Sequence, residues 1–164
     1  MSKNPVLTAL EIQAQKESIA LQITERGYAF IFSNMTTDTP AFLYTIGLQT
    51  KGRPEIFLSG NMEAATGMKL IEGVVAKWKK ANAVLLGRMG RHLQVGKLQM
   101  PIELLEVDAK AAAHEYTTLI GQTFPDTDYR LVQLFWPDAA GKLPTSKTYT
   151  KDPGHRQHKL AVLK

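Results

Sequence analysis

The side chains of this chain that could move a proton or hold a polar ligand include Tyr44, Thr45, His92 and Asp138. Tyr44 and Thr45 each offer a hydroxyl, and a histidine such as His92 normally titrates near neutrality. An enzyme with a pocket near Tyr44, His92 and Asp138 is therefore one hypothesis, although the sequence contains no recognisable catalytic motif. Each residue also has a structural interpretation, because a tyrosine ring can fill a core and an aspartate can order a turn.

Two arginines, Arg88 and Arg91, lie among glycines in a segment that ends at His92. Arginines held in this way could grip a carboxylate or a phosphate with paired hydrogen bonds. The segment lacks the spacing of a phosphate-binding loop or a dinucleotide-binding fingerprint, and the alternative is an exposed basic hairpin turn. We expect this segment to bind a ligand or partner together with Lys77 and Lys80.

Positive charge is concentrated in two stretches of a chain whose net charge is +5. Six basic and no acidic residues lie between Lys77 and Lys97, and six more from Lys142 onward are opposed by Asp152 alone. Such stretches can attract an acidic protein surface, a small anion or a nucleic acid, or can simply be solvated. Nucleic-acid binding stays an alternative, although no aromatic interleaving or known nucleic-acid-binding motif accompanies the charge.

Metals and cofactors have little support in the sequence. His155 and His158 are spaced like metal ligands, but the chain has no cysteine and Asp152 is the one carboxylate close by. We expect no metal and no cofactor. The absence of cysteine, of a long apolar run and of an apolar N-terminal segment predicts a cytoplasmic protein without a secretory signal.

The elements that must position these residues follow from hydrophobic periodicity, capping and turn signals. Thr8 and Glu11 form a capping box, and the apolar run that ends at Trp136 predicts a central strand. We expect Trp78 and Trp136 to be buried. The predicted elements are a helix over about Ala9–Arg26 ended by Gly27, strands over Tyr28–Phe32, Ala41–Leu48 and Glu55–Leu58, a helix capped by Asn61, a strand over Ala83–Leu86, a meander to Val107, a helix from Asp108 to Gly121, and a strand over Arg130–Trp136.

This order of elements predicts an α+β fold, with a mainly antiparallel sheet packed with about three helices, because strands and helices do not alternate strictly. We expect residues 1–144 to form a single domain. Residues 145–164 are predicted to be a basic, partly mobile C-terminal tail.

Three segments of the chain together resemble the bacterial and phage domain-of-unknown-function family 4262. They are YTIGL at Tyr44–Leu48, GRPEIFLSG at Gly52–Gly60, and WPDAAGKLP at Trp136–Pro144. The chain departs from that family's pattern at Arg53, where many relatives carry histidine, and at Thr145, where an aromatic residue often follows the proline. The family has no established activity, so the resemblance implies the fold rather than the function.

The leading hypothesis is a non-catalytic binding protein that engages a protein partner or a small anionic ligand through its basic face. A compact, cysteine-free chain without a recognisable catalytic set favours binding over catalysis. The resemblance alone adds the hypothesis of a phage accessory protein that acts on a host factor.

Overall fold

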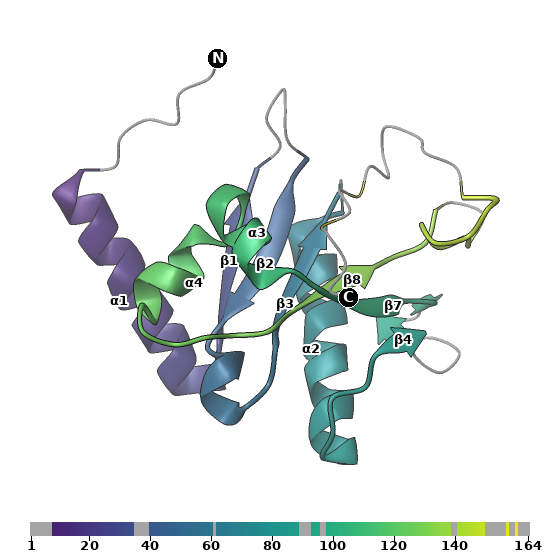
Figure 1. Cartoon of the computed structure of the whole chain (residues 1–164), viewed down its shortest axis with the longest axis horizontal. Helices are drawn as coiled ribbons and strands as arrows, with labels where there is room; N and C mark the ends of the chain where they lie inside the picture. The colour runs from purple at the N-terminus through teal and green to yellow at the C-terminus, as the bar shows by residue number, and fades with distance from the viewer. Residues whose placement is uncertain are drawn as a thin grey trace.

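The computed structural model describes residues 8–34, 40–60, 62–88, 93–95, 98–138 and 141–149, together with 157 and 160. Figure 1 shows the path of the chain through a central sheet with helices on both sides. The elements are α1 (Ala9–Arg26), β1 (Ala29–Ser33), β2 (Phe42–Ile46), the 3₁₀ helix η1 (Leu48–Lys51), β3 (Glu55–Ser59), α2 (Ala64–Ala81), β4 (Gly87–Arg88), β5 (Leu93–Val95), β6 (Leu98–Met100), β7 (Glu103–Val107), α3 (Ala109–Glu115), α4 (Thr118–Thr123) and β8 (Leu131–Phe135).

The first helix begins and ends at the predicted residues. The Thr8 hydroxyl accepts from the Glu11 amide at 3.2 Å, and the Glu11 carboxylate accepts from the Thr8 amide at 2.8 Å. These two bonds satisfy backbone donors that an uncapped helix would leave without partners. At the other end, Gly27 takes a left-handed conformation with φ 97° and donates to the Ile23 carbonyl.

Six strands form the main sheet in the order β1-β2-β3-β8-β7-β4. The pairs β1–β2, β2–β3, β7–β8 and β4–β7 are antiparallel, whereas β3 and β8 are parallel. The mainly antiparallel sheet and the α+β class are therefore confirmed. The last predicted strand is central, because β8 lies between β3 and β7 and all five of its residues are buried.

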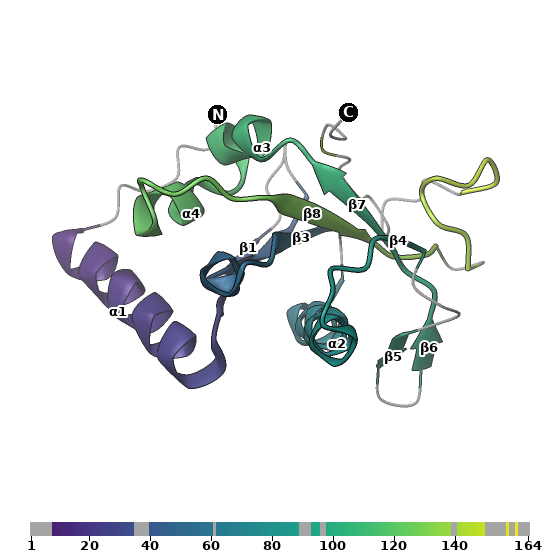
Figure 2. The same ribbon diagram turned by 60° about the horizontal axis from the view of Figure 1, so that its bottom comes forward.

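Two hydrophobic cores lie on opposite faces of the sheet. Figure 2 shows α2 below the sheet and α3 and α4 above it, with α1 at the side where β1 forms the edge. The α2 face holds Trp78, which is fully buried, and Trp136, which is 5% exposed, so both tryptophan predictions are confirmed. The other face packs Ile19 of α1 with residues of α3, α4 and the central strands.

Three predicted elements differ from the structure. Residues 83–86 are not a strand: the Trp78 indole donates to the Leu85 carbonyl at 3.0 Å, and this segment runs back along α2 before β4 begins. The third predicted helix is divided into α3 and α4 at the buried residue Thr117. The second helix has Glu63 as its N-cap, and the predicted cap Asn61 lies outside the described residues.

No helix in the described part of the chain is long and apolar enough to cross a membrane.

Candidate functional site

A buried carboxylate, that of Glu55, lies at the start of β3 and accepts four hydrogen bonds. Its Oε1 accepts from the Thr45 hydroxyl at 2.9 Å and the Leu48 amide at 3.0 Å. Its Oε2 accepts from the Gly47 amide at 2.8 Å and the Gln49 side-chain amide at 3.2 Å. We call these five residues the carboxylate clasp. It ties the end of β2 and the start of η1 to β3.

The local sequence explains why the clasp forms. The Thr45 hydroxyl also accepts from the Ile56 amide at 2.9 Å, so it links the two strands through a side chain. Gly47 has φ 121°, and a Cβ there would lie 3.1 Å from the Gly27 carbonyl oxygen and from Tyr28 Cα. A glycine is therefore needed both for the backbone conformation and for the close approach of the segment that follows α1.

Burial governs the electrostatics of the clasp. It raises the pKa of Glu55 above its ordinary value, because desolvation outweighs the four hydrogen bonds that favour the charged form. Tyr129 is near enough for the Glu55 charge to contribute to its raised pKa, although burial is the larger cause. Gln49 donates to Glu55, while its own Oε1 is buried and has no hydrogen-bond partner among the residues that the structure describes.

The clasp is closed to a substrate. Glu55 and Thr45 are fully buried, and every strong acceptor position of the carboxylate is already filled. Among the described residues, no three histidine, aspartate or glutamate side chains gather in a way that could hold a metal ion. The clasp therefore serves to fix the backbone of residues 45–49.

The two predicted hydroxyl groups, on Tyr44 and Thr45, point to opposite faces of β2. Thr45 belongs to the clasp. Tyr44 is 2% exposed and packs in the core on the face of the sheet opposite α2. There the ring of Phe42 stacks on it, with 6.1 Å between the ring centroids. Burial raises the pKa of the Tyr44 phenol, and this effect is larger than the lowering caused by a hydrogen bond with the Leu119 backbone. Neither hydroxyl is available to a substrate.

Asp138 orders a turn. Its Oδ1 accepts from the Lys142 amide at 2.8 Å, its own amide donates to the Lys142 carbonyl, and the Gly141 amide donates to the Asp138 carbonyl. Gly141 has φ 79°, as the predicted turn requires. Just before the turn, the Trp136 indole donates to the Ser59 carbonyl at 2.9 Å, which anchors it to the end of β3.

The basic residues are described only in part. Lys77 and Lys80 are exposed on α2, and Arg88 is exposed on β4, where its guanidinium lies 3.8 Å from the Glu103 carboxylate. Arg91 and His92 lie outside the described residues. The described part of this segment is consistent with a solvated face as well as with a binding surface.

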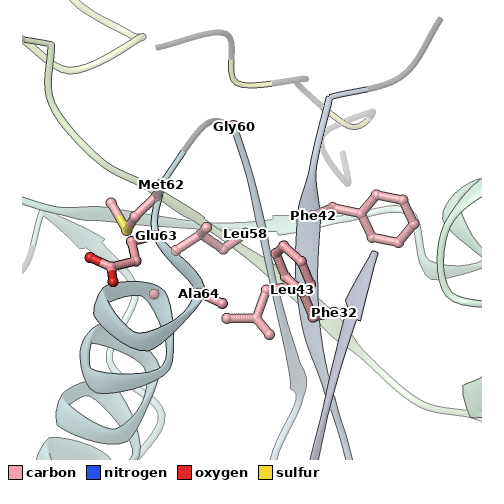
Figure 3. A pocket seen from close by; sticks show the side chains of 9 residues that line it. Phe32, Phe42, Leu43, Leu58, Gly60, Met62, Glu63 and Ala64 are labelled. Carbon is pink, nitrogen blue, oxygen red and sulfur yellow. The ribbon is translucent and has the colours of Figure 1, made fainter. Parts of the chain in front are cut away.

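An apolar notch lies where β2 and β3 meet the start of α2 (Figure 3). Leu43, Leu58 and Phe32 turn toward the helix, and the Glu63 carboxylate points away from them. The cavity has a volume of about 10 Å³. That space holds about one water molecule, so the notch is too small to bind a ligand.

A much larger groove lies between α1 and α4, which are side by side in Figures 1 and 2. Its volume is about 560 Å³, and we call it the α1–α4 groove. The apolar part of its lining comes from Ile12, Ile19 and Ile23 of α1 and from Leu119 and Phe124 at α4. The polar part consists of Gln15, Lys16, Thr24, Thr50, Gln122 and Thr123, and Ala20 completes the lining.

Neither Glu55 nor the α1–α4 groove was predicted as a site. A signal for Glu55 was present, because a carboxylate begins a strand whose other residues are mostly apolar and lies within a motif segment. The isoleucines of α1 were recognisable as one face of a helix. The groove could not be inferred from them, because it depends on where α4 packs.

A family model with the description "Domain of unknown function (DUF4262)" matches residues 22–150. No curated protein and no solved structure matches the chain.

Proposed function

The chain belongs to this family, DUF4262, and we propose that it is a non-catalytic protein that binds a small, elongated, largely apolar ligand in the α1–α4 groove. The observation that carries the proposal is the groove itself. Its volume of about 560 Å³ falls in the range of small-molecule sites, roughly 300–1,000 Å³, and its lining combines apolar side chains with a few polar ones, as such sites do.

The state of the polar residues supports binding rather than catalysis. A catalytic acid or base must come within hydrogen-bond reach of the reacting group. Tyr44, Thr45, Glu55 and Asp138 are all buried, and each is engaged in holding its own part of the fold. The described residues that line the groove include no carboxylate, histidine or tyrosine that could take such a role.

The dimensions of the groove favour a small molecule over a helix from a partner protein. At a rise of about 1.5 Å per residue, Ile12 and Thr24 lie about 18 Å apart along α1. A helix of that length and about 10 Å across would fill roughly 1,400 Å³. This exceeds the volume of the groove, so such a helix could place only part of its surface in it. A narrow, extended chain fits better.

The cysteine-free composition further supports a cytoplasmic location.

Binding of decanol, a neutral ten-carbon chain, tests the proposal. We expect saturable one-site binding by isothermal titration calorimetry, with amide chemical-shift changes confined to residues around the groove. Ala20→Trp should abolish it, because Ala20 lines the groove and the indole would fill the space. Ala14→Trp is the matched control: Ala14 is exposed on the same helix and does not line the groove. No binding to the wild type, or equal binding to both variants, would overturn the proposal.

A further inference from the structure

The hydroxyl groups that line the α1–α4 groove are already engaged as donors. Thr24 donates to the Ala20 carbonyl at 3.0 Å, and Thr50 donates to the Gly47 carbonyl at 2.7 Å. Thr123 donates to the Leu119 carbonyl at 2.7 Å. Each hydroxyl has a single proton, so none of these threonines can donate a hydrogen bond to a ligand without giving up its own bond.

Three other polar side chains of the lining are uncommitted. The side chains of Gln15, Lys16 and Gln122 make no hydrogen bond or ion pair with another residue in the described part of the chain. Gln15 and Lys16 belong to α1, and Gln122 belongs to α4, so donors are present on both walls of the groove. An amide group offers two N–H donors and an ammonium group offers three.

The charge of the lining has one sign. Among the described residues that line the groove, Lys16 is the one that is charged. On a helix, a side chain meets those three and four positions away, and for Lys16 these are Ile12, Gln13, Ile19 and Ala20, none of them acidic. The neighbouring Glu17 does not face Lys16, and its carboxylate accepts from Gln13 at 3.2 Å. The positive charge of Lys16 is therefore not neutralised along its own helix.

Resting on the proposed function, we infer that the ligand of this groove is a single-chain amphipathic carboxylate. Its apolar chain lies along Ile19, Ile23 and Leu119. Its carboxylate group accepts hydrogen bonds from the Lys16 ammonium and from the amides of Gln15 and Gln122. A carboxylate matches this set because it is an acceptor without donors and carries the opposite charge to the one cation present. The lysine stem can extend along the apolar floor while its ammonium stays at the rim.

Three probes of equal chain length test the head group: decanoate, decanol and decylamine, each titrated into the full chain by calorimetry below its aggregation concentration. We expect decanoate to bind about tenfold more tightly than decanol, and decylamine to bind more weakly than both. Lys16→Met keeps an apolar stem of similar length. In this variant the affinity for decanoate should fall to that for decanol, while the affinity for decanol should not change. Lys69→Met, an exposed lysine of α2 outside the groove, is the matched control and should behave as the wild type.

The outcomes separate this inference from the function on which it rests. If decanol and decanoate bind equally to the wild type, the carboxylate assignment is wrong. If Lys16→Met leaves the preference for decanoate intact, the contact assigned to Lys16 is wrong. In both cases the groove still binds apolar chains. If decylamine binds most tightly, the assigned charge is also wrong. If none of the three probes binds, the proposed function itself fails.

Discussion

Replacing Glu55 is the most direct test of the carboxylate clasp as a structural device. In Glu55→Ala, the amides of Gly47 and Leu48 lose their acceptor, and both residues are buried. An unsatisfied buried donor costs about 1–3 kcal/mol, so two of them should lower the free energy of unfolding by about 2–6 kcal/mol. The side chains of Thr45 and Gln49 can rotate to other partners, so they add less.

Glu55→Gln gives a finer test because it keeps the shape of the side chain. The Gly47 and Leu48 amides bond to different carboxylate oxygens, and the single oxygen of an amide can serve only one of them. The other amide then faces an NH₂ group. We therefore expect the free energy of unfolding at pH 7, measured by urea-induced unfolding, to fall by about 1–3 kcal/mol. Glu25→Gln, at an exposed position of α1, is the matched control and should change stability by less than about 0.5 kcal/mol. A Glu55→Gln protein as stable as the control would refute the clasp.

The pH dependence of the Glu55→Gln effect tests the electrostatics. Because burial raises the pKa of Glu55 in the folded state, the folded chain binds more protons than the unfolded chain between the ordinary value of 4.5 and the raised value. The wild type therefore loses stability relative to Glu55→Gln as the pH rises through that window. We expect Glu55→Gln to lower the free energy of unfolding by more at pH 4 than at pH 7. A loss that instead grows with pH would show that the four hydrogen bonds outweigh desolvation.

Three further substitutions test the packing around the clasp and the sheet. Trp136→Ala should cost about 3–5 kcal/mol in chemical unfolding, since it empties a large buried site and removes the bond to the Ser59 carbonyl; a cost below about 1 kcal/mol would contradict the placement of this residue. Gly47→Ala should cost at least about 1 kcal/mol more than Gly141→Ala, because both have positive φ but only Gly47 is crowded by three atoms at 3.1 Å; equal costs would remove the packing argument. Arg88→Ala should change the melting temperature little, because its ion pair with Glu103 is long and Arg88 is largely exposed; a large drop would mean that the pair is worth more than its geometry indicates.

The parts of the fold that depend on local signals could be predicted from the sequence. The ends of α1 follow from Thr8, Glu11 and Gly27, whose side chains or backbone act within one turn of the helix. The central position of β8 follows from a continuous apolar run, because a strand covered on both faces needs no polar side. The turn at Asp138 follows from residues that bond to their own neighbours.

The parts that depend on tertiary contacts could not be predicted. Residues 83–86 are apolar enough for a strand, but the Trp78 indole takes the Leu85 carbonyl and the segment follows α2 instead. The third predicted helix has suitable periodicity, yet Thr117 interrupts it, and its hydroxyl lies 3.2 Å from that of Tyr129. The role of Glu55 required the knowledge that β2 and β3 pair next to η1, which brings four donors to one carboxylate.

The family match includes the carboxylate clasp but leaves out most of the α1 wall of the α1–α4 groove. The match covers residues 22–150, and this region contains the whole carboxylate clasp and the turn at Asp138. The motif segments that carry the resemblance are therefore accounted for by the fold: they hold β2, η1, β3 and β8 in place. Gln15, Lys16 and Ile19 of the α1–α4 groove precede residue 22, so they lie outside the match, whereas Leu119 and Gln122 lie inside it. One wall of the groove thus belongs to the shared domain and most of the other does not. It follows that the ligand preference proposed here depends on α1, and that membership of the family does not by itself imply it.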